Sequence, residues 1–314
     1  MKTTQPASAP ASESIPTSLP FSHPQENRRP GWLGWLPLAV FPTVAASVRQ
    51  TLTPWVFMWA MAVALFAAFK WQVWWKAVRG GRDASAFRSL AFLFLWPGMD
   101  ADRFLSRRRP VAPPTAKLWL FALAKTVFGA GLLWGVARLA GNELLAGWMG
   151  MVGLIFFLHF GTLHLLSLFW QWRGIDARPL MSSPVSARSL GEFWGKRWNA
   201  GFRDLAFGLW FVRLRALLSP RLATLTVFLI SGLIHELAIT IPARAGYGLP
   251  TCYFLIQGTG VLGERTCFGA GLRRTWAGRI FTIATVTLPV FALFPAPFVL
   301  RVMVPFFHSI KALP

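Results

Sequence analysis

The chain has 314 residues, of which 54% are hydrophobic and only 14% are charged, and it contains 17 Trp and 28 Phe. Globular domains in water usually have about a quarter of their residues charged, so this composition excludes an ordinary soluble enzyme, a disordered protein and a disulfide scaffold. The formal net charge is +21, which on a soluble protein would suggest nucleic acid. In a chain this apolar it instead fits basic loops beside anionic headgroups, so we expect membrane lipids and no nucleic acid as partners.

Residues 1–30 repeat Pro and Ser without an apolar run and are expected to form a disordered cytoplasmic tail. From residue 31 to residue 314 we expect a single transmembrane domain, because apolar stretches recur close to the roughly 20 residues that cross a bilayer as a helix. These stretches lie near residues 32–47, 54–75, 118–136, 144–170, 222–242, 249–263 and 280–306. The sequence therefore predicts an all-α, polytopic membrane helix bundle with about seven or eight spans.

Three features depart from regular spans. Ser89–Trp96 is apolar but too short to cross a bilayer, so it is expected to be a re-entrant or surface helix. Pro295 and Pro297 predict a break in the last stretch. Lys125 lies inside a predicted span and must either reach the interface or find an internal partner.

Basic residues are concentrated in three segments. Residues 76–117 and 171–221 carry nine Lys and Arg each, and residues 264–279 carry four more, whereas the other loops hold few. Under the positive-inside rule these segments and the N-terminus share the cytoplasmic side. Arg is far commoner than Lys, which is typical of a GC-rich bacterial genome, so we expect a bacterial inner membrane.

His235 and Glu236 stand in the apolar stretch 222–242, within the sequence SGLIHE. An ionisable group in the hydrocarbon layer is costly unless it is satisfied, so we expect His235 to line an internal cavity. The pair begins like the zinc motif HExxH, but Ile239 stands where the second His ligand would be. We therefore expect no metal and no cofactor at this site.

Two further motifs bear on function. His159 and His164 are five residues apart, about 140° around a helix, and cannot share a metal. Packing and a role in a cavity both stay open for these two residues. Glu192–Asn199 alternates aromatic and basic residues, which fits a helix at the cytoplasmic face with buried rings and with bases among the headgroups.

Together these motifs resemble the wax-synthase branch of the membrane-bound O-acyltransferases. The similar segments, within roughly residues 90–265, are Trp96–Asp100, His159–Met181, Glu192–Asn199 and Ser231–Glu236. The resemblance implies transfer of a fatty acyl group from acyl-CoA, the co-substrate, to a hydroxyl, with His235 and Asn199 as the catalytic pair. The short chain favours a long-chain alcohol, which would give a wax ester. A sterol, a diacylglycerol or a smaller alcohol stays open as the acceptor.

The solubility of the two substrates implies that they enter from different sides. The lipophilic alcohol would reach His235 from the lipid, and acyl-CoA would arrive from the cytoplasm. A neutral imidazole can remove the alcohol proton as the alcohol oxygen attacks the thioester carbonyl. Asn199 can orient that carbonyl or stabilise its developing oxyanion. Both roles for Asn199 stay open.

The predicted substrate-binding residues surround this pair. Lys196, Arg197 and Arg203 are candidates for the CoA phosphates, because ammonium and guanidinium groups bind phosphate, although a solvated basic loop would explain them equally well. The other candidates are Trp194, Trp198 and Glu236. Glu236 points about 100° away from His235 around the helix and is better placed to bond another helix than to orient the imidazole.

Two other classes of protein stay open. An intramembrane His–Glu pair with basic loops also fits a transporter with a proton relay. Transporters often contain internal repeats, and we find no repeat relating 32–136 to 222–306. An inactive relative that binds lipid is the other alternative, and the oligomeric state is open in every case.

Overall fold

The computed structural model describes residues 31–82, 85–107, 111–266, 271 and 275–314, and these residues form helices and connecting loops without a β-strand. Five helical stretches in this part of the chain are long and apolar enough to cross a membrane. They are Pro54–Arg79, Ala116–Leu139, Glu143–Trp172, Pro220–Ala243 and Trp276–Leu293. The prediction of an all-helical, polytopic membrane bundle is thus confirmed, while the tail expected over 1–30 lies outside the described residues.

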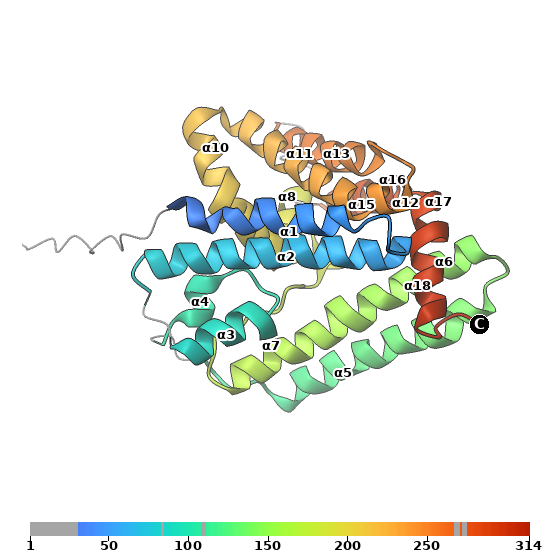
Figure 1. Cartoon of the computed structure of the whole chain (residues 1–314), viewed down its shortest axis with the longest axis horizontal. Helices are drawn as coiled ribbons and strands as arrows, with labels where there is room; N and C mark the ends of the chain where they lie inside the picture. The colour runs from blue at the N-terminus through green and yellow to red at the C-terminus, as the bar shows by residue number, and fades with distance from the viewer. Residues whose placement is uncertain (1–30, 83–84, 108–110, 267–270, 272–274) are drawn as a thin grey trace, which may run out of the picture.

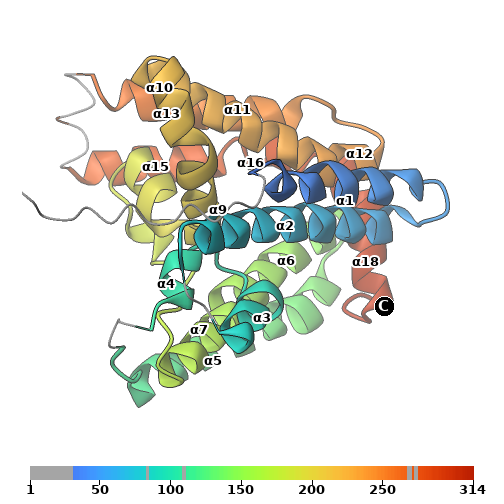
Figure 2. The same cartoon turned by 60° about the vertical axis from the view of Figure 1, so that its left-hand side comes forward.

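The first group of helices begins at η1 (Gly31–Gly34) and α1 (Leu36–Ser47), and α1 packs along α2 (Pro54–Arg79), as Figures 1 and 2 both show. Next come two short helices at one end of the bundle, α3 (Ala86–Leu95) and α4 (Ala101–Leu105). With ten residues, α3 would span only about 15 Å, in keeping with the short helix that we expect near residue 89.

A long helical hairpin follows. Its first arm joins α5 (Ala116–Ala130), η2 (Gly131–Gly135) and η3 (Val136–Leu139), and its second arm joins α6 (Glu143–Leu154), η4 (Ile155–Thr162) and α7 (Leu163–Trp172). The segment η4 is a π-helix, so its turns are wider than those of an α-helix. Glycines bring the two arms into backbone contact: a Cβ on Gly129 would lie 2.1 Å from the Phe157 nitrogen, and one on Gly161 would lie 2.4 Å from Thr126 Oγ1.

Short helices then cross one end of the bundle before the second helical layer. These are η5 (Pro184–Ser186), α8 (Leu190–Glu192), η6 (Phe193–Arg197), α9 (Ala200–Leu205), η7 (Ala206–Phe211) and α10 (Val212–Leu217). The second layer contains α11 (Pro220–Ala238), α12 (Thr240–Ala243), α13 (Leu249–Gly263), α15 (Trp276–Thr287) and α16 (Val290–Leu293). The 15 residues of α13 span about 22 Å, less than the roughly 30 Å of a bilayer core. Five helical stretches of the described residues are long and apolar enough to cross a membrane, fewer than the seven or eight spans expected, and α13 is one of the expected spans that is too short.

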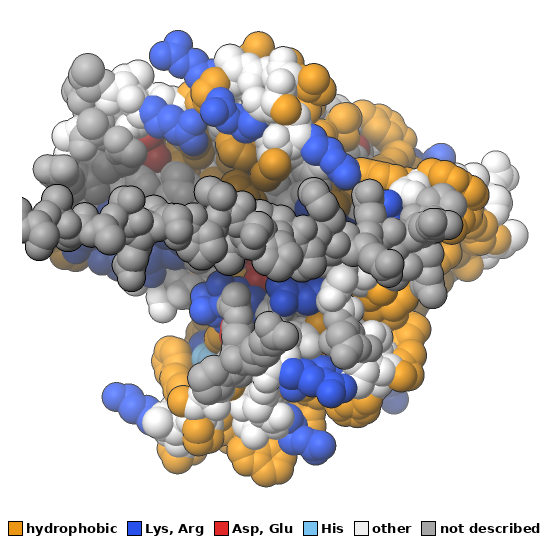
Figure 3. Space-filling view, turned by 90° about the vertical axis from the view of Figure 1, so that its left-hand side faces the viewer, with side chains coloured by type: hydrophobic (Ala, Val, Ile, Leu, Met, Phe, Trp, Pro, Cys, Tyr) orange, Lys and Arg blue, Asp and Glu red, His pale blue; other side chains and the backbone are white. Residues whose placement is uncertain are grey.

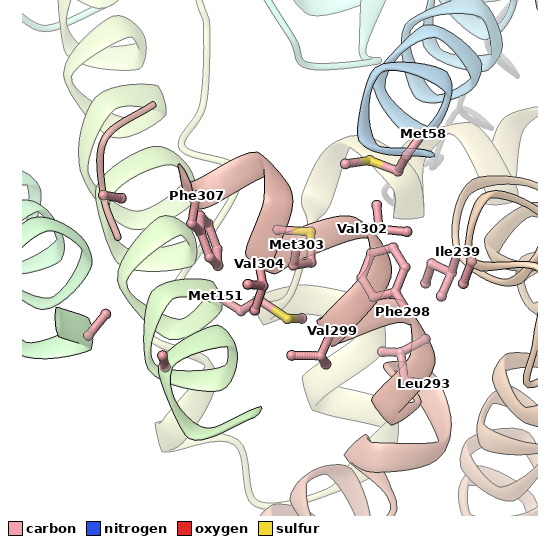
Figure 4. Packing of buried hydrophobic residues seen from close by; sticks show 14 of the residues in the cluster. Met58, Met151, Ile239, Leu293, Phe298, Val299, Val302, Met303, Val304 and Phe307 are labelled. Atoms are coloured by element: carbon pink, nitrogen blue, oxygen red, sulfur yellow. The ribbon is translucent and has the colours of Figure 1, made fainter. Parts of the chain in front are cut away.

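The last apolar stretch is broken at Pro295, as predicted. It continues after the break as α17 (Ala296–Phe298), η8 (Val299–Met303) and α18 (Val304–Ser309). Figure 4 shows the buried side chains of this C-terminal segment between Met151 of α6 and Met58 of α2. The break thus turns the chain into the centre of the bundle, where Val299, Val302 and Phe307 are fully buried.

The end of α2 and the helices α3, α4 and α10, which belong to two of the basic segments, lie at the same end of the bundle as residue 31, on the left in Figure 1. Figure 3 looks onto this end, where Lys and Arg side chains are spread over the face. Loops on one side of a membrane must emerge from the same end of its helices, so this arrangement agrees with the alternation of charge in the sequence.

Candidate active site

A cavity of about 560 Å³, which we name the His235 cavity, lies between the short helices η6 and α9 and the spans that contain α11 and η4. His235, Asn199 and His159 all line it. The rest of the wall is mostly apolar, with side chains such as Phe228, Val286, Val290, Leu293 and Phe294. The structure therefore brings the two residues predicted to be catalytic onto the wall of one apolar chamber.

His235 is held in one orientation by its own helix and by a neighbouring ring. Its Nδ1 lies 2.7 Å from the Ser231 carbonyl oxygen, and the imidazole packs on Phe254 with ring centroids 4.5 Å apart. A carbonyl oxygen can only accept a hydrogen bond, so Nδ1 carries the proton of the neutral ring and Nε2 carries the lone pair. Within the described part of the chain Nε2 has no hydrogen-bond partner, which leaves it available as a base.

Asn199 occupies a left-handed backbone conformation, with φ 41° and ψ 67°, immediately before α9. Asn tolerates this region better than most residues. Its Oδ1 accepts a hydrogen bond from the Phe202 N–H at 3.1 Å and so caps the helix. The Nδ2 amide has no partner among the described residues, and its two hydrogens remain able to bind a substrate oxygen.

The two tryptophans of the segment Phe193–Asn199 form part of the wall. Trp194 donates from Nε1 to Gln257 Oε1 at 3.2 Å, so its polar edge is engaged and its ring serves as an apolar surface of the His235 cavity. Trp198 stacks on Phe193 at 5.5 Å between centroids with 14° between the rings. Unlike Trp194, Trp198 also lines a second, larger cavity.

This second cavity, which we name the Lys196 cavity, has a volume of about 1080 Å³. It runs from residues of the basic segments, such as Lys196, Arg203 and Arg178, to residues within the spans, such as Lys125 and His164. The two cavities lie side by side, because they share the lining residues Met181, Phe193, Trp198, Arg203, Val286 and Val290.

Most charged groups of the Lys196 cavity are already paired. Arg103 bonds Asp100 at 2.7 Å and Asp176 at 3.2 Å, and Arg203 bonds Asp204. Burial raises the pKa of Asp204 above its ordinary value, although Arg203 opposes the shift. Lys196 is exposed and forms no ion pair with a described residue, so it is open to an anionic ligand.

Arg197 differs from its neighbour Lys196. Its guanidinium bonds Glu192 at 2.7 Å and the carbonyls of Ser182 and Ser183 at 3.2 and 3.3 Å, and it lines neither cavity. Burial raises the pKa of Glu192, but hydrogen bonds from the Arg188 N–H and from Arg197 outweigh it and leave this pKa below its ordinary value. Glu192 is therefore ionised at neutral pH, and Arg197 connects η6 both to Glu192 and to the loop at residues 182–183.

Glu236, which the sequence predicts as a substrate-binding residue, lines neither cavity. Its Oε1 accepts from the Thr251 N–H at 3.1 Å and from Thr251 Oγ1 at 2.9 Å, and its Oε2 accepts from Thr240 Oγ1. Thr251 lies in the first turn of α13, where backbone N–H groups lack partners within the helix and a carboxylate is favourable. The expected turn of 100° from His235 thus directs Glu236 to a neighbouring helix.

Lys125 finds an internal partner, which is one of the two outcomes that the sequence allows. Its Nζ lies 2.8 Å from His164 Nδ1 and 4.5 Å from the centre of the Phe121 ring. His164 lines the Lys196 cavity, whereas His159 lines the His235 cavity. This separation agrees with the 140° between the two residues around a helix.

Two buried ionisable residues that bond to backbone groups at the two cavities are missed by the sequence analysis. Glu264 is only 5% exposed and accepts from the backbone N–H groups of Leu190 and Gly191, in the first turn before the segment that carries Asn199. Lys70 is 1% exposed and donates from Nζ to the Gly98 carbonyl, and its Nζ lies 3.3 Å from the centre of the Phe92 ring. The position of Lys70 deep in an apolar stretch is a signal that could have identified it.

Part of the chain matches a known protein family. Residues 177–256 match the model described as "Membrane bound O-acyl transferase family". The matched stretch contains Asn199 and His235, together with both tryptophans of the wall. No curated protein matches the chain. The family match supports a membrane-bound O-acyltransferase, and the multi-pass helical bundle agrees with it.

Proposed function

We propose that this membrane acyltransferase moves a fatty acyl group from acyl-CoA to a long-chain alcohol and so makes a wax ester. One observation carries the proposal. The Nδ1–H of His235 is directed to the Ser231 carbonyl, which leaves Nε2 as a base in an apolar cavity that Asn199 also lines. A general base beside an amide donor is the arrangement that acyl transfer to a hydroxyl requires.

The reaction needs no covalent enzyme intermediate, because the CoA thiolate is a good leaving group. His235 Nε2 takes the hydroxyl proton while the alcohol oxygen bonds to the thioester carbon. The negative charge on the former carbonyl oxygen is stabilised by the Nδ2 hydrogens of Asn199. When the carbon–sulfur bond breaks, the thiolate leaves, and the imidazolium returns the proton to sulfur or to solvent.

The Lys196 cavity supports acyl-CoA as the donor. It extends from the basic end of the bundle into the spans and meets the His235 cavity along Trp198 and Arg203. The phosphates of CoA would lie near Lys196 at the basic end, and the acyl chain would lie between the spans. The thioester would then reach the wall that the two cavities share.

The mostly apolar wall of the His235 cavity favours a lipophilic acceptor. We therefore place a long-chain alcohol there, ahead of a sterol, a diacylglycerol or a smaller alcohol. We also propose that the basic end faces the cytoplasm of a bacterial cell, with the N-terminus on that side. A Cys placed at Ser183 should react with an impermeant reagent only after the membrane is opened, and reaction in intact cells would reverse this orientation.

The test is an assay of the purified protein in lipid nanodiscs with radiolabelled acyl-CoA and a panel of acceptors. A long-chain alcohol should give the most ester, and the His235→Ala variant should give none above background. If a sterol or diacylglycerol were the better acceptor, the wax-ester proposal would be replaced by that activity. If no acceptor gave ester, transport or lipid binding would become the better account.

A further inference from the structure

His159 lies on the wall of the His235 cavity, in the π-helical segment η4. Neither ring nitrogen has a hydrogen-bond partner in the described part of the chain, and Nδ1 is buried. Wide π-helical turns inside longer helices occur frequently at functional sites. An unpaired polar group in an apolar surrounding is costly, so a ligand oxygen that reached this ring would recover a lost interaction.

The backbone around His159 is fixed against the neighbouring helix. Two residues before it, the nitrogen of Phe157 lies 2.1 Å from the position of a Cβ on Gly129, and two residues after it, a Cβ on Gly161 would lie 2.4 Å from Thr126 Oγ1 of α5. Only glycine permits such an approach, so η4 cannot rotate freely against α5. The imidazole is therefore held on the cavity wall by packing that leaves its nitrogens unpaired.

Three hydroxyl groups on the same wall are already engaged. The hydroxyls of Ser231, Thr224 and Tyr253 donate to the carbonyls of Val227, Pro220 and Val286 at 2.8, 2.8 and 3.1 Å. His164, one and a half turns along the helix from His159, is paired with Lys125. Unlike these hydroxyls and His164, His159 has no hydrogen bond to a described residue. His235 Nε2 and the Asn199 amide are unpaired in the same way.

We propose that His159 binds the hydroxyl oxygen of the acceptor alcohol through a ring N–H, an inference that rests on the proposed function. His159 and His235 both belong to spans, from which a lipid-borne alcohol arrives, whereas Asn199 and Arg203 belong to the basic end, where the thioester arrives. The hydroxyl has one proton, and His235 removes it, so the contact with His159 must be donated by the imidazole to an oxygen lone pair.

The experiment compares His159→Phe, which keeps a ring and loses the N–H, with His159→Gln, which keeps an N–H donor. Binding of tritiated 1-hexadecanol to the purified protein is measured in detergent, with hexadecane as the competitor for non-specific partition. Loss of one hydrogen bond should weaken alcohol binding and raise the apparent KM for the alcohol about threefold to tenfold in His159→Phe. The KM for acyl-CoA should not change, and His159→Gln should recover much of the loss.

A matched control is His308→Phe, because His308 is exposed on α18 and lines neither cavity. Equal alcohol affinity in His159→Phe and in the wild type would overturn the proposal, as would an equal rise in KM for both substrates. A wild-type protein that bound no alcohol would overturn it too. If the wild type bound alcohol in a His159-dependent way but made no ester, the proposed function would fail and the hydroxyl site would stand. If His159→Phe does not fold, His159→Ala takes its place. The proposal then predicts weaker alcohol binding and a higher alcohol KM in His159→Ala than in His159→Gln, and equal values would overturn it.

Discussion

In the His235 cavity the groups able to react have no partner, whereas in the Lys196 cavity beside it most charged groups are already paired. His235 Nε2 and the Asn199 amide are free among the described residues of an apolar wall. Arg103 and Arg178, which line only the Lys196 cavity, are in contrast bonded to carboxylates. A site for chemistry needs polar groups held ready for the transition state, and a site that only binds can use charges held in place by their neighbours. The difference supports the proposal that the chemistry takes place in the first cavity and that the second cavity binds the acyl donor.

After His235, the largest effect that we expect from this comparison belongs to Asn199. Replacing Asn199 by Ala removes the Nδ2 donor and should lower kcat about 10²- to 10³-fold, the usual loss for one oxyanion donor. Its KM values should change little, since the interaction forms mainly in the transition state. Asn199→Asp keeps the oxygen that caps α9 but lacks the amide hydrogens, so it should be as slow as Asn199→Ala while unfolding near the wild-type temperature. An active Asn199→Asp variant would limit Asn199 to the cap.

Glu236 sharpens the contrast, because it is next to His235 in sequence but belongs to no cavity. Glu236→Gln should destabilise the protein by about 1.5–3 kcal/mol, since the charged acceptor of the Thr251 and Thr240 hydrogen bonds is lost. Thermal unfolding should move to lower temperature, while turnover per folded molecule stays within a few fold of the wild type. A hundredfold loss of kcat at unchanged unfolding temperature would instead place Glu236 in the chemistry.

The sequence predicts the parts of this site that depend on local pattern. A His in an apolar stretch indicates a cavity. Helical periodicity predicts that Glu236 points away from its neighbour His235, and that His164 points away from His159. The contribution of Glu264 depends on a contact with Leu190, 74 residues away, which no local pattern encodes. The cap that Asn199 forms on α9 and the wide turn at His159 likewise depend on the folded backbone.

The smallest effect that we expect concerns the neighbouring bases Lys196 and Arg197. Lys196→Ala should raise the KM for acyl-CoA about twofold to fivefold, the range for an exposed charge, and should reduce its dependence on salt. The KM for the alcohol should not change. Arg197→Ala removes bonds to Glu192 and to the 182–183 loop, so it should lower the unfolding temperature. If the two variants raised the KM for acyl-CoA equally, Lys196 could not be distinguished as a ligand-binding residue from Arg197 as a structural one.

The central claim, that His235 is the general base, is tested most directly by single-turnover transfer in the His235→Gln variant with both substrates bound at saturation. This variant keeps a similar volume and a hydrogen-bonding side chain but cannot accept the proton, so ester formation should be about 10²- to 10⁴-fold slower than in the wild type. Affinities for alcohol and acyl-CoA should be preserved. A near wild-type rate of ester formation in this variant would contradict the account.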